Sequence, residues 1–147
     1  MAVDGGALDP SNPVVRLLAA GMAAEAEARR DDAKVLFEQA WDASRDDFEA
    51  CMAAHYLARC QPDVGSELHW NEEALRRADA AADERVRGFY ASLHLNVGHS
   101  LEQLGRTADA CRHYALGTAR LADVPAGPYA NLVRMGLEAG SDRTRGA

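Results

Sequence analysis

The sequence contains few aromatic residues, no isoleucine and only one lysine. Phe, Trp and Tyr make up 6% of its 147 residues, so alanine and leucine must supply most of the packing. Alanine loses no side-chain entropy in a helix, whereas β-branched residues favour strands. No segment alternates convincingly between apolar and polar residues, as a half-buried strand would. These absences predict an all-α protein.

Basic residues are fewer than acidic residues, and nearly all of them are arginine. There are 16 lysines and arginines against 23 acidic residues, which gives a net charge of −7. The arginines are interspersed with carboxylates, as in Arg29-Arg30-Asp31-Asp32. A protein that binds duplex nucleic acid needs a clustered basic surface to displace counterions. The sequence therefore predicts neither a nucleic acid nor an anionic membrane as the partner.

Other features that would indicate secretion or membrane insertion are missing. The three cysteines, Cys51, Cys60 and Cys111, are too few and odd in number for a disulfide framework. No apolar run approaches the ~20 residues of a transmembrane helix. Residues 1–12 lack the basic start of a signal peptide. We therefore expect a cytoplasmic protein with reduced cysteines.

Helix-start and helix-stop residues divide the chain into a flexible leader (1–12), a helical domain (13–140) and a disordered tail (141–147). Asn12-Pro13 and Ser66 indicate helix starts, whereas Gly105 indicates a helix end. Together with apolar residues at helical spacing, these signals predict seven helices, at 13–29, 31–43, 46–58, 67–82, 83–104, 107–122 and 129–139.

Two parts of the chain share a regular spacing of small and aromatic residues. In each, a glycine is followed after twelve residues by an alanine, four residues later by an aromatic residue, and three residues later by another small residue. The two series are Gly21, Ala33, Phe37, Ala40 and Gly98, Ala110, Tyr114, Gly117. Small residues allow paired helices to approach closely, and the aromatic ring fills the space beside them. The spacing therefore predicts helical hairpins with these residues at the crossings.

This pattern resembles the tetratricopeptide repeat, and Leu95-Asn96-Val97-Gly98-His99 is similar to the core of that repeat. The resemblance implies an α-solenoid of about three stacked antiparallel hairpins with a C-terminal capping helix. A degenerate middle unit would carry His55 and Asn71 at the small and aromatic positions, with Trp70 supplying the missing bulk. A generic antiparallel helix bundle is the alternative, because it would also place Ala and Gly at helix crossings.

The resemblance also implies a partner-binding groove lined by the first helix of each hairpin. Tyr and Arg are common at binding hot spots, and asparagine at the Asn96 position of this family often binds the main chain of a ligand. We therefore predict that six residues contact a partner: Met52, Tyr56, Arg59, Tyr90, Asn96 and His99.

No motif for catalysis or for a cofactor is present. Cys51, His55, Cys60 and His69 could suggest a metal site, but they lack the closely paired ligands typical of zinc sites. The favoured interpretation is that Cys51 and His55 pack inside a hairpin. Tyr90 and His94, four residues apart, could touch. The sequence predicts no catalytic residue, no metal and no cofactor.

The sequence as a whole predicts a non-enzymatic module that presents a helical groove to a peptide or helix of another protein. Two alternatives remain open. The first is a structural module that associates with itself, for example as a homodimer through an apolar face. The second is a small-molecule-sensing or accessory domain, which would require a closed, aromatic-lined pocket.

Overall fold

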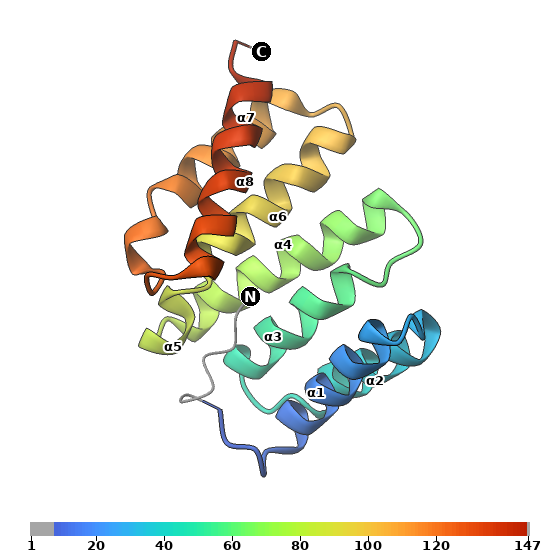
Figure 1. Ribbon diagram of the computed structural model, residues 1–147. Helices are drawn as coiled ribbons and strands as arrows, with labels where there is room; N and C mark the ends of the chain where they lie inside the picture. The colour runs from blue at the N-terminus through green and yellow to red at the C-terminus, as the bar shows by residue number, and fades with distance from the viewer. Residues whose placement is uncertain (1–7, 147) are drawn as a thin grey trace. The chain divides into compact units, whose positions relative to one another are not determined.

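The computed structural model describes residues 8–146, and over this range all regular secondary structure is helical, as predicted. The chain divides into two compact units, residues 3–81 and residues 82–147, which we describe separately. Figure 1 shows the course of the helices within each unit.

The unit of residues 3–81 contains two helical hairpins. Helix α1 pairs with α2, and α3 pairs with α4, while α3 also packs against α1 and α2. The bounds of these helices are α1 Pro13–Ala26, α2 Arg30–Ala43, α3 Asp47–Ala58 and α4 Val64–Ala81. Helix α3 is the centre of this unit, since every residue from Phe48 to Ala58 is buried.

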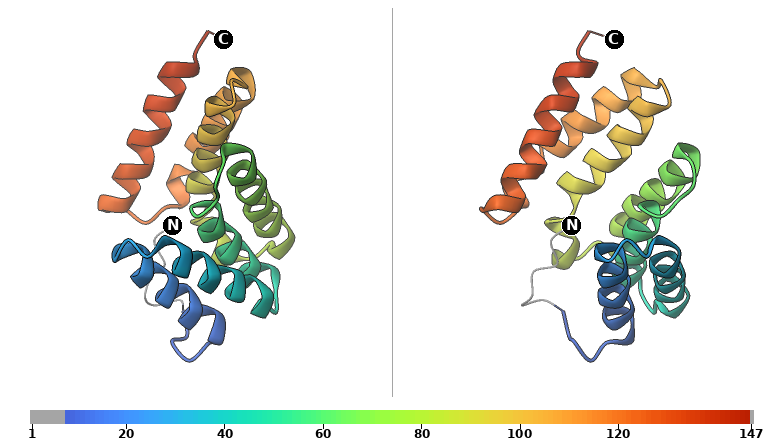
Figure 2. Two further views of the ribbon diagram at one scale, coloured as in Figure 1. Left: turned by 90° about the vertical axis from the view of Figure 1, so that its right-hand side faces the viewer. Right: turned by 45° about the vertical axis from the view of Figure 1, so that its right-hand side comes forward.

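The unit of residues 82–147 consists of one hairpin covered by a third long helix. Helices α6 and α7 form the hairpin, and α8 packs against both (Figure 2). Two short elements complete the unit. The bounds are α5 Glu84–Arg87, α6 Tyr90–Gln103, α7 Thr107–Thr118, the 3₁₀ turn Leu121–Asp123 and α8 Pro128–Thr144.

The α1–α2 and α6–α7 hairpins have the same local structure at positions 77 residues apart. In the first turn, the Arg29 amide donates to the Ala24 carbonyl at 2.9 Å, and in the second the Arg106 amide donates to the Leu101 carbonyl at 2.9 Å. The residue before each arginine has a left-handed backbone, with φ 61° at Ala28 and 76° at Gly105. The chain therefore builds the same hairpin twice.

The glycines predicted to lie at the hairpin crossings are confirmed there. A Cβ atom added to Gly21 would collide with the Phe37 ring, and one added to Gly98 would lie 2.8 Å from Cε1 of Tyr114. Gly21, Gly98 and both rings are buried. The absence of a side chain on one helix thus makes room for the aromatic ring of the other, as the spacing predicted.

The α3–α4 hairpin fills its interior differently. His55 stands where the other two hairpins have glycine, and Asn71 stands where they have an aromatic ring; both are buried. The large side chain is thus on the first helix and the small one on the second. Trp70 does not replace the aromatic ring, contrary to prediction: it packs edge-to-face on Trp41 of α2, with ring centroids 5.1 Å apart.

Several predicted helix boundaries were wrong: α1 ends at Ala26 and α7 at Thr118, three and four residues earlier than predicted. Helix α4 begins at Val64 rather than after Ser66, because the Asp63 carboxylate accepts a hydrogen bond from the Ser66 amide at 2.7 Å and takes the capping role. The predicted helix 83–104 is interrupted by a turn at Gly88-Phe89. A Cβ on Gly88 would lie 3.4 Å from the Asp123 carbonyl oxygen, so the chain bends where the 121–125 segment approaches it.

The last helix is longer than predicted. It continues past Ala139 to Thr144, whose side chain is buried and whose hydroxyl donates to the Gly140 carbonyl oxygen at 2.7 Å. Gly140 lies against the face of the Tyr114 ring, so this ring is enclosed by glycines from α6 and α8. The Glu102 carboxylate accepts hydrogen bonds from Tyr114 at 2.5 Å and from Arg143 at 2.7 Å, which holds α8 against the hairpin.

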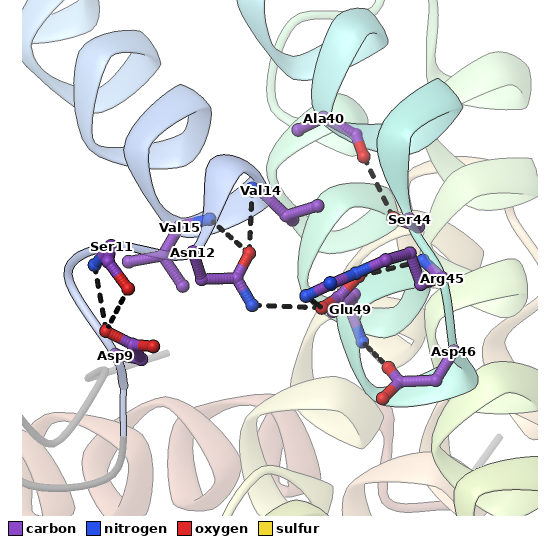
Figure 3. Close-up of polar contacts among 10 residues, drawn as sticks. All are labelled: Asp9, Ser11, Asn12, Val14, Val15, Ala40, Ser44, Arg45, Asp46 and Glu49. Carbon is purple, nitrogen blue, oxygen red and sulfur yellow. Dashed lines mark hydrogen bonds and ion pairs between the residues drawn. The ribbon is translucent and has the colours of Figure 1, made fainter.

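A buried carboxylate joins the beginnings of α1 and α3 (Figure 3). Glu49 accepts hydrogen bonds from the Asn12 side chain at 3.0 Å, from the Arg45 amide at 2.8 Å and from the Arg45 guanidinium at 3.1 Å. Asn12 in turn caps α1 by accepting from the Val14 amide at 2.8 Å. Burial raises the pKa of Glu49, but these donors outweigh it and the pKa is lowered from its usual 4.5.

Glu49→Gln is expected to destabilise the protein at pH 7 and to weaken its sensitivity to acid. Because the folded-state pKa of Glu49 is lowered, its stabilisation is present above pH 4.5 and is lost as the pH falls through the folded-state value. Glutamine would place an amide donor opposite existing donors, at a cost of about 1–3 kcal/mol. Urea unfolding between pH 3 and 7 measures the free energy of unfolding of the variant at each pH. The control is Glu72→Gln, on the exposed surface of α4, and an equal loss of stability in that variant would contradict the role given to Glu49.

Candidate functional site

The six residues predicted to contact a partner divide equally between the two units. In the unit 3–81, Met52 and Tyr56 are 0% and 2% exposed, so the structure places them in the interior rather than on a surface. Tyr56 stacks on Phe37, with ring centroids 5.2 Å apart. Arg59 is exposed; its guanidinium pairs with Glu25 at 3.2 Å and lies 5.9 Å from the Tyr56 ring centroid.

In the unit 82–147, the other three predicted residues lie along α6. His99 is exposed, whereas Asn96 and Tyr90 are half-buried. Tyr90 begins the helix and His99 follows nine residues later, about 13 Å further along the axis. Tyr90 and His99 therefore lie at opposite ends of α6, and the neighbours of Tyr90 are residues outside the predicted set.

A hollow of about 480 Å³ lies beside Tyr90. It is open to solvent and combines one aromatic ring, two guanidinium groups and two carboxylates with small apolar side chains. Its lining residues come from the α4–α5 turn, from α5, from the start of α6 and from the segment that follows α7: Ala82, Asp83, Glu84, Val86, Arg87, Tyr90 and Arg120.

Ion pairs hold the two guanidinium groups of the hollow in place. Arg120 lies over the Tyr90 ring, 4.2 Å from its centroid, which is a cation–π contact. Asp123 accepts hydrogen bonds from Arg120 at 3.0 Å and from Arg87 at 3.1 Å. The hydrogen bond from Arg120 is the main reason that the pKa of Asp123 is lowered. The carboxylate therefore stays ionised and orients both arginines.

Two histidines continue this arrangement away from the hollow. The Tyr90 ring stacks on His94, with centroids 6.3 Å apart and planes at 26°, which confirms the predicted contact of this pair. His94 faces His113 of α7, and their Nδ1 atoms are 3.1 Å apart. Arg120, Tyr90, His94 and His113 thus form a continuous row along the α6–α7 hairpin. Sequence reasoning missed Arg120 and His113 because both are brought in by the hairpin from more than 18 residues away.

A second hollow, of about 470 Å³, lies at the α2–α3 turn in the unit 3–81. The Arg77 guanidinium packs over Trp41, 5.1 Å from the ring, and pairs with Asp47 at 2.9 Å. The remaining lining is mostly charged and comes from the turn and from the adjoining ends of α2 and α3: Asp42, Ser44, Arg45, Asp46 and Ala50. Both hollows share an arginine stacked on an aromatic ring and fixed by an aspartate.

Cys51 and His55 of α3 are both buried. Burial raises the pKa of Cys51 to about 12, so its thiol stays protonated at neutral pH. Burial also lowers the pKa of His55 to about 3, so its imidazole is neutral. Within residues 8–146, no group of three or more His, Cys, Asp or Glu side chains is placed to hold a metal ion.

No family model, no curated protein and no solved structure matches the chain. Among the residues that the structure describes, none of the helices is both long and apolar enough to span a membrane.

Proposed function

We propose that this protein is a non-enzymatic interaction module of the tetratricopeptide type, which binds a peptide or helix of another protein. The observation that carries the proposal is the hairpin repeated at a distance of 77 residues. Both copies have the same turn hydrogen bonds, and both place an aromatic ring on a glycine. A glycine-to-aromatic crossing of this kind is what the sequence shares with that family, whose members bind other proteins.

The hollow beside Tyr90 is the proposed recognition site. It offers an aromatic ring, hydrogen-bond donors from Arg87 and Arg120, and carboxylates at Asp83 and Glu84, in an open hollow that an extended side chain could enter. Tyrosine and arginine contribute strongly to protein–protein binding, because they combine a large contact area with directional hydrogen bonds. The ion pairs with Asp123 fix the arginines before binding, which lowers the entropic cost of association.

Self-association is a second candidate function, favoured by the outer surface of α8. Leu132 and Met135 are 67% and 59% exposed and lie one helical turn apart, so they form an uncovered apolar surface. Sedimentation velocity at low micromolar concentration separates this function from the first. A concentration-dependent dimer that Met135→Glu abolishes would favour self-association.

Tyr90→Ala is expected to weaken the binding of partner peptides by at least about tenfold, and Arg87→Glu is expected to do the same. Peptides are first selected from a random phage-displayed library against the full chain, and their Kd values are then measured by fluorescence anisotropy. Arg134→Ala, at an exposed position of α8, is the control and should change Kd less than twofold. Circular dichroism verifies that each variant is folded.

Two results would contradict this assignment of the site. The first is a set of selected peptides whose Kd is unchanged by both Tyr90→Ala and Arg87→Glu. The second is the absence of any selected peptide that binds the full chain specifically.

A further inference from the structure

The guanidinium of Arg120 uses only part of its hydrogen-bonding capacity within the protein. Its plane lies 4.2 Å from the Tyr90 centroid, and its Nε donates to Asp123 at 3.0 Å. Among the residues that the structure describes, no group accepts a hydrogen bond from its two Nη atoms. The edge that carries these two atoms fits a carboxylate in a bidentate manner. Because Arg120 lines the hollow, these donors are accessible to a ligand there.

The corresponding arginine of the second hollow has no such opening. Arg77 also lies over an aromatic ring, but its Nη1 pairs with Asp47 at 2.9 Å and its Nε pairs with Glu73 at 2.9 Å. Two carboxylates therefore satisfy Arg77, whereas Arg120 has one. The comparison indicates that the place of the second carboxylate on Arg120 is left for a ligand.

The charges beside Arg120 favour an anionic ligand. Asp123 accepts hydrogen bonds from both Arg120 and Arg87, so one negative charge lies between two positive charges. Glu84 also pairs with Arg87, but its side chain is 85% exposed and its oxygens are 3.3 and 3.4 Å from Nη1, so an incoming carboxylate can displace it. Asp83 is neutralised by a neighbouring arginine at 2.8 Å. The two guanidinium groups thus retain one positive charge when Glu84 moves aside.

The distribution of charge along the chain agrees with this local balance. Residues 82–147 carry eight arginines and seven acidic side chains, whereas residues 3–81 carry eight basic and 16 acidic side chains. The unit that contains the hollow therefore repels an acidic ligand far less than the other unit does.

We infer that the partner residue that enters the hollow is an aspartate or a glutamate, whose carboxylate accepts two hydrogen bonds from the Nη atoms of Arg120. This inference rests on the function proposed above and names the chemistry that the hollow recognises. Tyr90 supports the plane of the guanidinium and Asp123 fixes its rotation, so the donors are oriented before the carboxylate arrives. Glu84 competes with the ligand for the same pair of arginines.

The peptides selected by phage display, synthesised with amidated C-termini, test the inference, since every carboxylate in them then belongs to a side chain. Each peptide that Tyr90→Ala or Arg87→Glu weakens should contain an acidic residue whose replacement by its amide raises Kd about tenfold or more. Arg120→Gln should weaken the original peptide similarly and make it insensitive to that replacement. Glu84→Gln should lower Kd, a gain that misfolding would not produce. Arg134→Gln, at an exposed position of α8, is the control and should leave Kd unchanged.

Two results would overturn the inference while leaving the proposed function in place. The first is a peptide that depends on Tyr90 or Arg87 but binds the Arg120→Gln protein as tightly as the unaltered protein. The second is such a peptide whose acidic residues can all be replaced by amides without loss of affinity. If no selected peptide depended on Tyr90 or Arg87, the proposed function would fail, and the inference would fail with it.

Discussion

Gly21→Ala is expected to destabilise the protein by about 1–3 kcal/mol, although alanine is normally the better helix former. The new Cβ would collide with the Phe37 ring, which is buried and stacked on Tyr56. The ring cannot move away without disturbing the centre of the unit 3–81. Overpacking therefore outweighs the gain of about 0.5–1 kcal/mol that replacing a helical glycine usually brings.

Gly65→Ala is the matched control, since it makes the same change in the same unit. Gly65 is exposed in the first turn of α4, and an added Cβ would meet only the Asp63 carboxylate, at 3.3 Å. We expect no loss of stability there. Urea unfolding followed by circular dichroism gives both values. Equal changes at Gly21 and Gly65 would show that Gly21 does not lie at a helix crossing.

Tyr56→Ala is expected to have the largest effect, a loss of about 3–5 kcal/mol. The sequence predicted Tyr56 to be a groove residue that contacts a partner. The structure shows a ring that is 2% exposed and stacked on Phe37, so its removal leaves a cavity inside the unit 3–81. Arg59→Ala, only three residues away, should cost less than about 1 kcal/mol, because the Arg59 side chain is 55% exposed and its ion pair with Glu25 is screened by solvent on that side.

Thermal and urea unfolding of these two variants separate packing from binding. If Tyr56→Ala and Arg59→Ala proteins had equal stability, the buried position of Tyr56 would be contradicted. Tyr56 would then have to lie on the surface, as the sequence predicted.

The elements of the fold that depend on local sequence were predictable. Asn12-Pro13 begins α1, and Asp46 caps α3. The spacing from Gly21 to Phe37 and from Gly98 to Tyr114 indicated which helix faces meet, because a missing side chain and a large ring must occupy the same space. These features involve neighbours within one hairpin, where sequence distance and spatial distance are closely linked.

The features that were missed depend on contacts between segments far apart in the sequence. The helix breaks at Gly88 because the 121–125 segment approaches the chain there. The residues around Gly88 do not by themselves predict this approach. The burial of Met52 and Tyr56 arises because α3 packs on several helices at once, whereas the family pattern assigns them to one open face. In the α3–α4 hairpin, the positions of His55 and Asn71 were predicted, but the packing of Trp70 on Trp41 of α2 was not, because it joins two different hairpins.

The candidate site was predictable only in part, for the same reason. Tyr90 was selected from the sequence, and its contact with His94 follows from their spacing on one helix. Arg120 and His113 join them only when α7 folds back along α6. The proposed recognition site is therefore a property of the hairpin and not of a continuous motif.

The central claim is that the two equivalent hairpins are built by an aromatic ring lying on a glycine. A ¹³C-edited NOESY spectrum of the full chain tests this claim most directly. The account predicts strong cross-peaks from the α-protons of Gly21 to the Phe37 ring and from those of Gly98 to the Tyr114 ring, with α-proton shifts displaced by the ring currents. Glycine α-protons at random-coil shifts, without cross-peaks to these rings, would contradict it.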